Sequence, residues 1–166
     1  AIKLDSRGPV FFTQERVGRE GHLIKVIKIR TMRDIPSIKT SVTTGKDPRI
    51  TKLGRFFRRT KIDELPQLIN VLLGQMSFVG PRPDVPGFAD ELTGEDRIVL
   101  TVRPGITGPA SIRFRDEEDL LAQQKDPERY NRDVIYPEKV RINRKYIENY
   151  SFWKDLYYIA VTIAGH

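Results

Sequence analysis

The chain has 166 residues, a length that fits one domain with its own hydrophobic core, and we predict that residues 1–166 form a single domain. Its 29 lysines and arginines outnumber its 22 aspartates and glutamates, and the net charge of +7 favours an anionic partner such as a nucleic acid, an anionic membrane surface or a nucleotide. The absence of cysteine excludes disulfides and thiolate metal sites, and no uninterrupted apolar run approaches the roughly 18 residues of a membrane-spanning helix.

The first predicted element is a β-hairpin. A short strand over residues 10–14 and a second strand over residues 22–30 flank a loop that contains two glycines. The second strand would place Lys28 and Arg30 at one edge of a site. Periodicity alone favours the alternative, in which both side chains lie on a solvated face of the strand.

A loop and a basic helix follow the hairpin. Residues 34–46 are rich in Ser, Thr, Pro and Gly and lack an apolar period, so we predict a mobile surface loop. The next helix is predicted over residues 48–59, with Asp47 as its cap. Its apolar side comprises Ile50, Leu53 and Phe57, and its cations are Lys52, Arg55, Arg58 and Arg59. Such a helix either packs on a core or lies against anionic lipid headgroups, and the pattern leaves both open.

Two adjacent carboxylates, Asp63 and Glu64, stand at the predicted start of the central helix. From Leu65 onward apolar residues recur at a spacing of three and four, which predicts one apolar stripe on a helix that ends near Gly74. Pro66 belongs in a first helical turn, so both acids would lie at the positive end of the helix dipole, where free N–H groups lower a carboxylate pKa and help to hold a phosphate. In the simpler alternative, Asp63 caps the helix and Glu64 occupies its first turn.

Cations surround this acidic pair in the sequence. Arg58 and Lys61 precede it, and Arg82 follows within residues 77–83, where prolines stiffen the backbone that presents the guanidinium. Carboxylates beside cations suit a substrate that carries a phosphoryl group, because the cations stabilise charge that a carboxylate alone would repel. In the structural alternative, Arg82 is buried and pairs with one of the two acids, and the two roles can coexist.

The C-terminal half is predicted to be mainly helical. One or two short helices over residues 86–100 precede a glycine-rich turn over residues 103–108, whose backbone N–H groups could reach an anion. Further helices are predicted over residues 116–124, from residue 126, over 137–149 and over 152–164. The last of these has few charges and carries aromatic residues at one end, so it either lies at a membrane surface or packs as a core helix.

Four sequence blocks together resemble the bacterial sugar transferase family, the monotopic polyprenyl-phosphate phosphoglycosyl transferases that begin bacterial glycan assembly. The blocks occur in the family's order as KIRTM (28–32), RRTKIDELPQL (58–68), MSFVGPRP (76–83) and RPGITG (103–108). Members carry a hydrophobic re-entrant helix just before the segment that opens this chain, so we expect the soluble part of such a protein with that membrane helix trimmed. After Gly108 the chain departs from the commoner family pattern, so of the arginines in this region only Arg103 is carried over.

The resemblance implies an enzyme, a polyprenyl-phosphate sugar-1-phosphate transferase. It would transfer sugar 1-phosphate from a UDP-sugar to undecaprenyl phosphate or a similar polyprenyl phosphate, with release of UMP, at the cytoplasmic face of the bacterial inner membrane. Asp63 would be the nucleophile that forms an aspartyl phosphosugar intermediate. Glu64 would either join Asp63 in holding Mg²⁺ or orient and activate the incoming phosphate. The implied phosphate-binding residues are Arg82, Arg58, Lys28, Arg30 and Arg103.

For the fold we predict an α+β architecture, mostly helical, with one small antiparallel β-hairpin and amphipathic helices in roughly one plane toward the bilayer. Two functions without catalysis stand beside the enzyme. A nucleic-acid-binding module would explain the positive charge, but the chain has no such motif and no cations interleaved with aromatics on a strand, so we expect no nucleic acid partner. A peripheral membrane scaffold would explain the basic and aromatic helices and leaves the acidic pair beside Arg82 without a role.

Overall fold

A β-hairpin organises the N-terminal half of the molecule. In the computed structural model, which describes residues 1–38, 40 and 42–165, strands β1 (Phe11–Val17) and β2 (Leu23–Ile29) pair antiparallel. The register places Phe12 opposite Lys28, near the end of the hairpin that lies away from its turn. The predicted hairpin is therefore confirmed, and its first strand is longer than predicted.

Helices form most of the remaining structure, in agreement with the predicted α+β fold. The α-helices are α1 (Ile2–Asp5), α2 (Lys52–Thr60), α3 (Gln67–Leu72), α4 (Pro109–Arg113), α5 (Glu117–Ala122), α6 (Pro127–Tyr130), α7 (Tyr136–Glu148) and α8 (Phe152–Ala164). The described residues also contain four 3-10 helices and one π-helical segment. The 3-10 helices are η1 (Arg19–Gly21), η2 (Ile62–Glu64), η3 (Ala89–Glu91) and η4 (Gly94–Leu100), and the π-helical segment is η5 (Asn131–Ile135). Within the described ranges, no helix has the length and apolar character needed to cross a bilayer.

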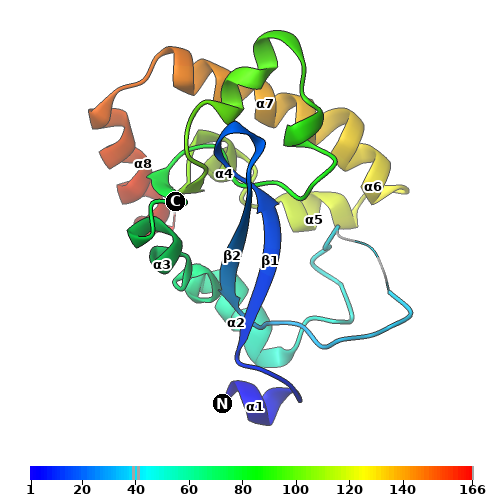
Figure 1. The fold of residues 1–166 in the computed structure, drawn as a ribbon. Helices are drawn as coiled ribbons and strands as arrows, with labels where there is room; N and C mark the ends of the chain where they lie inside the picture. Colours follow the sequence, from blue (N-terminus) through cyan, green and yellow to red (C-terminus); the bar gives the residue numbers. More distant parts are fainter. Residues whose placement is uncertain (39, 41, 166) are drawn as a thin grey trace.

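The elements surround the hairpin on two sides. Figure 1 shows β1 and β2 in the middle of the view, with α3 and α8 to the left and α5 and α6 to the right. A small core, formed by Val17, Ala89, Val99, Leu100 and Val140, joins the turn end of the hairpin to η4 and α7. The predicted helical segment over residues 86–100 is thus confirmed as two short helices, and it contributes three of these five core residues.

A second pairing, between β3 (Ser77–Val79) and β4 (Gly105–Thr107), corrects the predicted turn over residues 103–108. The two strands run parallel, and the backbone N–H of Gly105 donates to the carbonyl of Pro81 at 2.8 Å. A Cβ atom on Gly105 would lie 2.2 Å from the backbone nitrogen of Gly80, so only glycine allows this approach. The Gly105 N–H therefore holds the segment before Arg82 and is not available to an anion.

The start of the predicted basic helix is also corrected. Helix α2 begins at Lys52, and Thr51 is its cap, with Oγ1 accepting from the N–H of Gly54 at 2.9 Å. Asp47 lies outside the helix, where its buried carboxylate pairs with Arg49 at 2.7 Å. The side chain of Asp47 therefore satisfies a local ion pair and does not cap a helix.

The predicted surface loop over residues 34–46 connects β2 to α2. An isolated bridge between Met32 and Ile50 closes its base, and the Gly45 N–H donates to the carbonyl of Glu118 at 3.1 Å. Lys39 and Ser41 lie outside the described residues. The other residues of the segment form no regular element, and its mobility stays a prediction.

Helix α3 packs through its polar side. Its buried residues are Gln67 and Asn70, each 1% exposed, whereas the predicted apolar stripe points outward. The exposed apolar residues of this stripe are Leu65, Leu68, Ile69, Leu72 and Leu73. Asn70 fastens the helix to β2, because Oδ1 accepts from the N–H of Ile27 at 3.2 Å and Nδ2 donates to the carbonyl of Lys25 at 2.9 Å. This contact fixes β2, and Lys28 within it, beside η2.

We predict that Asn70→Ala lowers the free energy of unfolding by about 2 kcal/mol, because the buried amide that bonds to two backbone groups of β2 is lost and those groups lose their partner. Urea unfolding followed by circular dichroism would measure the change. Leu72→Ala is the matched control on the same helix, since Leu72 is 86% exposed, and it should change stability by less than about 0.5 kcal/mol. Equal losses in the two variants would contradict the role given to Asn70.

Candidate active site

The acidic pair lies in its own turn between two helices. Helix α2 ends where Lys61 adopts a left-handed conformation with φ of 58°, and Asp63 and Glu64 then form the end of η2, ahead of α3. A non-glycine residue at positive φ is strained, so the surrounding structure must hold it in place. The sequence predicts the pair at the start of the central helix, at its cap or first position. That placement is wrong, because α3 begins only at Gln67.

Glu64 is the centre of an ion cluster. Its carboxylate accepts from both Nη atoms of Arg82, at 3.0 Å for the Nη1–Oε2 pair, and Lys28 Nζ lies 3.3 Å from Oε1. Burial alone would raise the Glu64 pKa, but the positive charges of Arg82 and Lys28 outweigh it, and the pKa lies well below its usual range. Glu64 is therefore an anion that two cations from distant segments share.

Asp63 has a different environment from its neighbour. The residue is 5% exposed, and its Oδ1 atom is buried with no hydrogen-bond partner among the described residues. Burial first, and then the charge of Glu64, raise the Asp63 pKa, while Lys28 and Arg58 partly offset the rise. The predicted lowering of the pKa by a helix dipole is thus wrong for Asp63. An unpaired buried carboxylate oxygen is costly, which makes it a candidate for a bond to a ligand.

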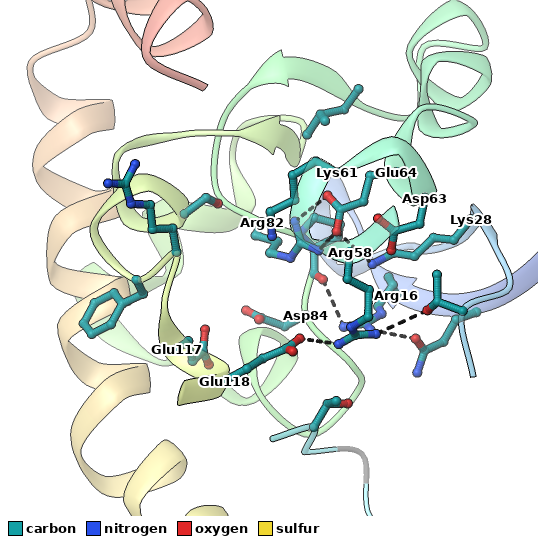
Figure 2. Close-up of a pocket in the computed structure, with 18 of the residues that line it drawn as sticks. Arg16, Lys28, Arg58, Lys61, Asp63, Glu64, Arg82, Asp84, Glu117 and Glu118 are labelled. Carbon is teal, nitrogen blue, oxygen red and sulfur yellow. Dashed lines mark hydrogen bonds and ion pairs between the residues drawn. The ribbon is translucent and has the colours of Figure 1, made fainter. Parts of the chain in front are cut away.

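Both acids line a cavity of about 2050 Å³. Figure 2 shows Asp63, Glu64, Lys28 and Arg82 gathered at one part of its wall. The Arg82 side chain keeps 38% exposure, so its guanidinium contacts Glu64 and still faces open space. Glu64 raises the Arg82 pKa, which keeps this side chain positively charged. The cavity therefore contains a permanent positive charge directly beside the unpaired Asp63.

The other predicted phosphate-binding residues lie at different distances from the pair. Arg58 lines the cavity and pairs with Glu118 of α5. Arg30 also lines it, but its guanidinium donates to backbone carbonyls of the N-terminal segment, including that of Ser6 at 2.8 Å. Arg103 is exposed and lines a separate, smaller cavity beside Tyr146. The structure thus brings Arg82, Lys28 and Arg58 to the acidic pair and places Arg30 and Arg103 away from it.

Several further charged residues, which the sequence did not predict as site residues, line the same cavity. Arg16 of β1 donates to the carbonyl of Pro83 at 3.3 Å, and burial followed by the nearby Arg82 lowers its pKa to about 10. Asp84, Glu117 and Glu118 lie together at another part of the wall (Figure 2). The position of Asp84, two residues after Arg82, was the one available signal in the sequence. Nothing in the sequence linked Glu117 or Glu118 to the site, because they come from a helix distant along the chain.

The predicted magnesium site can be tested against these contacts. Within the described ranges, no group of three or more His, Cys, Asp or Glu side chains could hold a metal ion. Both oxygens of Glu64 already accept hydrogen bonds from Arg82, so Glu64 is less free than Asp63 to bind a metal ion. Asp63 fits, because Mg²⁺ often binds one carboxylate and takes its remaining ligands from substrate phosphates and water. The arrangement therefore favours a substrate-assisted Mg²⁺ site on Asp63.

Taken together, the fold and the site define an α+β domain equipped for the chemistry of phosphorylated substrates, with an unpaired carboxylate beside clamped cations. The chain belongs to the bacterial sugar transferase family, whose profile matches residues 1–165. It is 40% identical over 168 residues to the UDP-glucose:undecaprenyl-phosphate glucose-1-phosphate transferase of Escherichia coli strain K12, a match that covers 98% of this chain and 34% of that protein.

Two further relatives match nearly the whole chain. The undecaprenyl-phosphate glucose phosphotransferase of Komagataeibacter xylinus is 41% identical over 171 residues, which cover 98% of this chain and 30% of that protein. The exopolysaccharide production protein PSS of Rhizobium leguminosarum bv. phaseoli is 40% identical over 173 residues, which cover 99% of this chain and 80% of that protein. The chain therefore spans about a third of the length of two of these relatives and most of the third.

We predict that Asp84 makes stability depend on pH between about 4 and 6. Burial raises its pKa to about 6, so in this window the folded protein keeps a proton that the unfolded chain releases. The stabilisation is complete below about pH 4 and is lost as pH rises through about 6. Asp84→Asn should remove this slope, a difference of about 2 kcal/mol in the free energy of unfolding between pH 4 and 6.5.

Urea unfolding of the wild type and Asp84→Asn at both pH values would measure this difference. Asp133→Asn serves as the matched control, because Asp133 is exposed and pairs only with the exposed Arg129 within the described residues. Parallel pH profiles for the wild type and Asp84→Asn would show that Asp84 does not titrate in this window.

Proposed function

We propose that this chain transfers sugar 1-phosphate from a UDP-sugar to a polyprenyl phosphate and releases UMP. One observation carries the proposal: Asp63 lines the cavity, its buried Oδ1 has no hydrogen-bond partner among the described residues, and it directly precedes in sequence a glutamate whose charge Arg82 and Lys28 already balance. Family membership supports a sugar transferase, and the names of the relatives from E. coli and K. xylinus support undecaprenyl phosphate as the acceptor.

In the first step, an oxygen of Asp63 attacks the phosphorus that carries the sugar. The bond between this phosphorus and the bridging oxygen breaks, and UMP leaves with the electron pair. The product is an aspartyl phosphosugar, so one displacement between two anionic substrates becomes two separate steps. The environment of Asp63 suits this role, because Oδ1 makes no hydrogen bond to a described residue that would have to break before the attack.

Arg82, Lys28 and Arg58 would hold the diphosphate while this happens. A guanidinium binds two phosphate oxygens at once, and Arg82 is both permanently charged and partly exposed to the cavity. Burial first, and then the proximity of Arg82, lower the Lys28 pKa to about 8, against the attraction of Glu64. Lys28 is therefore largely protonated at neutral pH and loses its charge when the solution becomes moderately alkaline.

Glu64 has a positioning role in this scheme. Because both of its oxygens accept hydrogen bonds, it holds Arg82 and Lys28 beside Asp63, which suits it better to orientation than to removing a proton. In the second step an oxygen of the polyprenyl phosphate attacks the same phosphorus, and the acyl phosphate bond breaks. Asp63 is thereby regenerated, and the phosphosugar now lies on the lipid.

Magnesium would be held by Asp63 together with substrate phosphate oxygens, and when bound it would neutralise phosphate charge and favour the approach of a carboxylate. Arg82, Lys28 and Arg58 would contribute the same electrostatic effect from the chain itself. Glu64, which was predicted as a second ligand, would act through Arg82 and Lys28.

We predict that Asp63→Asn abolishes the covalent intermediate and lowers the rate of UMP release by at least about a thousandfold, because an amide oxygen is a far weaker nucleophile. The measurements are UMP release from UDP-sugar plus undecaprenyl phosphate, and intact-protein mass spectrometry for the phosphosugar adduct. Asp133→Asn should behave like the wild type. Wild-type turnover in Asp63→Asn would refute the nucleophile, and the absence of turnover in the wild type would favour a membrane scaffold without catalysis.

A lipid acceptor requires contact with a membrane, and the exposed apolar side chains of α3, β3 and α8 support this contact. These side chains include Leu72 (86%), Phe78 (52%), Trp153 (76%) and Ile163 (82%). No residue of α8 is buried within the described part of the chain, and α3 and α8 lie on the same side of the hairpin in Figure 1. We propose that these side chains enter the headgroup region at the cytoplasmic surface of the bacterial inner membrane.

We predict that Leu72→Glu together with Leu73→Glu lowers binding to vesicles of phosphatidylglycerol and phosphatidylethanolamine by about tenfold or more. Two buried apolar contacts with lipid would be lost, and two negative charges would be repelled by the anionic surface. Vesicle co-sedimentation would measure the change. Leu23→Glu, on an exposed residue of β2, is the control and should bind as the wild type does. Equal binding by all three proteins would exclude this contact.

A further inference from the structure

Asp84 is fixed in position by its neighbours. It follows the segment from Pro81 to Pro83, in which both prolines restrict the backbone, and its carbonyl accepts from the N–H of Val17 at 2.8 Å. Its side chain is half-buried and lies in the cavity (Figure 2). The backbone that presents Arg82 therefore also presents Asp84 to the same space.

Asp84 differs from Glu64, Glu117 and Glu118 in having no bonded cation among the described residues. Glu64 pairs with Arg82 and Lys28, Glu118 pairs with Arg58, and Glu117 pairs with Lys139 at 2.6 Å. Among the described residues, the Asp84 carboxylate has neither a hydrogen bond nor an ion pair within bonding distance. Its oxygens are therefore available to a ligand.

Two buried hydroxyl groups of the same cavity are also without partners. Tyr136 Oη is buried with no hydrogen bond inside the described ranges, and Asp84 is among the charges that raise the Tyr136 pKa, after burial itself. Ser111 Oγ is likewise buried and unpaired there, and both residues line the cavity. Unpaired hydroxyl and carboxylate groups in one cavity are the groups with which proteins bind neutral, hydroxyl-rich ligands.

The chemistry of the proposed reaction indicates which part of the donor Asp84 can bind. A carboxylate repels phosphate, so Asp84 is unsuited to bind the diphosphate that Arg82 attracts. The leaving group, UMP, and the attacking lipid phosphate are both anions, so neither step requires a proton from an acid or its removal by a base. The part of the donor that remains is the sugar, whose hydroxyls donate well to a carboxylate.

We propose that Asp84, together with Tyr136 and Ser111 of the same cavity, binds the hydroxyl groups of the sugar and thereby determines which UDP-sugars the site accepts. This inference rests on the proposed function. A site built to pair with a hydroxyl discriminates strongly against a ligand that lacks the hydroxyl or places it differently, because a buried polar group is then left unpaired.

Equilibrium binding tests the proposal without turnover. Isothermal titration calorimetry in the Asp63→Asn background would compare UDP with UDP-glucose, UDP-galactose and their N-acetylated counterparts. We expect at least one UDP-sugar to bind more tightly than UDP. Asp84→Ala should reduce this advantage about tenfold and bring the affinities for the two epimers closer together, while the affinity for UDP falls by less than twofold. Asp84→Asn, which keeps the size of the side chain, should alter the preference among sugars, and Asp133→Ala should alter nothing.

Several results would overturn the inference: no UDP-sugar binds more tightly than UDP, Asp84→Ala leaves the sugar preference intact, or UDP and UDP-sugars weaken equally. The UMP-release assay with the wild-type chain separates this inference from the proposed function. If no UMP is released while Asp84→Ala still removes sugar-dependent binding, the transfer reaction is wrong and the sugar subsite stands.

Discussion

The ion pair between Glu64 and Arg82 is the interaction on which the site depends. It joins the turn between α2 and α3 to the segment that follows β3, and Lys28 adds strand β2 to the same carboxylate. Removing one member of this pair would leave an uncompensated charge beside the buried Glu64. The positions of the three segments therefore depend on one another. The pairing also keeps Glu64 ionised next to Asp63, and this adjacent charge helps to raise the Asp63 pKa.

The rest of the fold holds these three segments in place. Asn70 fixes α3 to the backbone of β2, which determines how far Lys28 lies from η2. The parallel pairing of β3 with β4 holds the backbone before Arg82, and the close contact of Gly105 with Gly80 explains why a bulky side chain cannot replace either glycine. Architecture and site are therefore closely linked, because the same contacts that hold the segments together also position Lys28 and Arg82.

The proposed contact with a membrane rests on the outward apolar face of α3. A helix normally buries its apolar stripe, but α3 buries amides and leaves its leucines in solvent. This arrangement costs stability in water and is reasonable if lipid covers the face. The acidic pair lies immediately before this helix, so a substrate phosphate anchored in the bilayer would reach Asp63 from the side on which the leucines are exposed.

The sequence by itself determined the hairpin, most of the C-terminal helices, the position of the acidic pair between two helices and the possibility that Arg82 pairs with it, because these depend on local periodicity, proline and motif spacing. Only the tertiary structure decided which face of α3 points inward, that residues 105–107 form a strand, and which cations reach Glu64. An apolar stripe in the sequence shows that a helix has an apolar and a polar face, but it does not show which of the two packs against the rest of the protein. Contacts such as Lys28 with Glu64, 36 residues apart, or Arg58 with Glu118, 60 residues apart, arise from packing between distant segments, which local patterns do not encode.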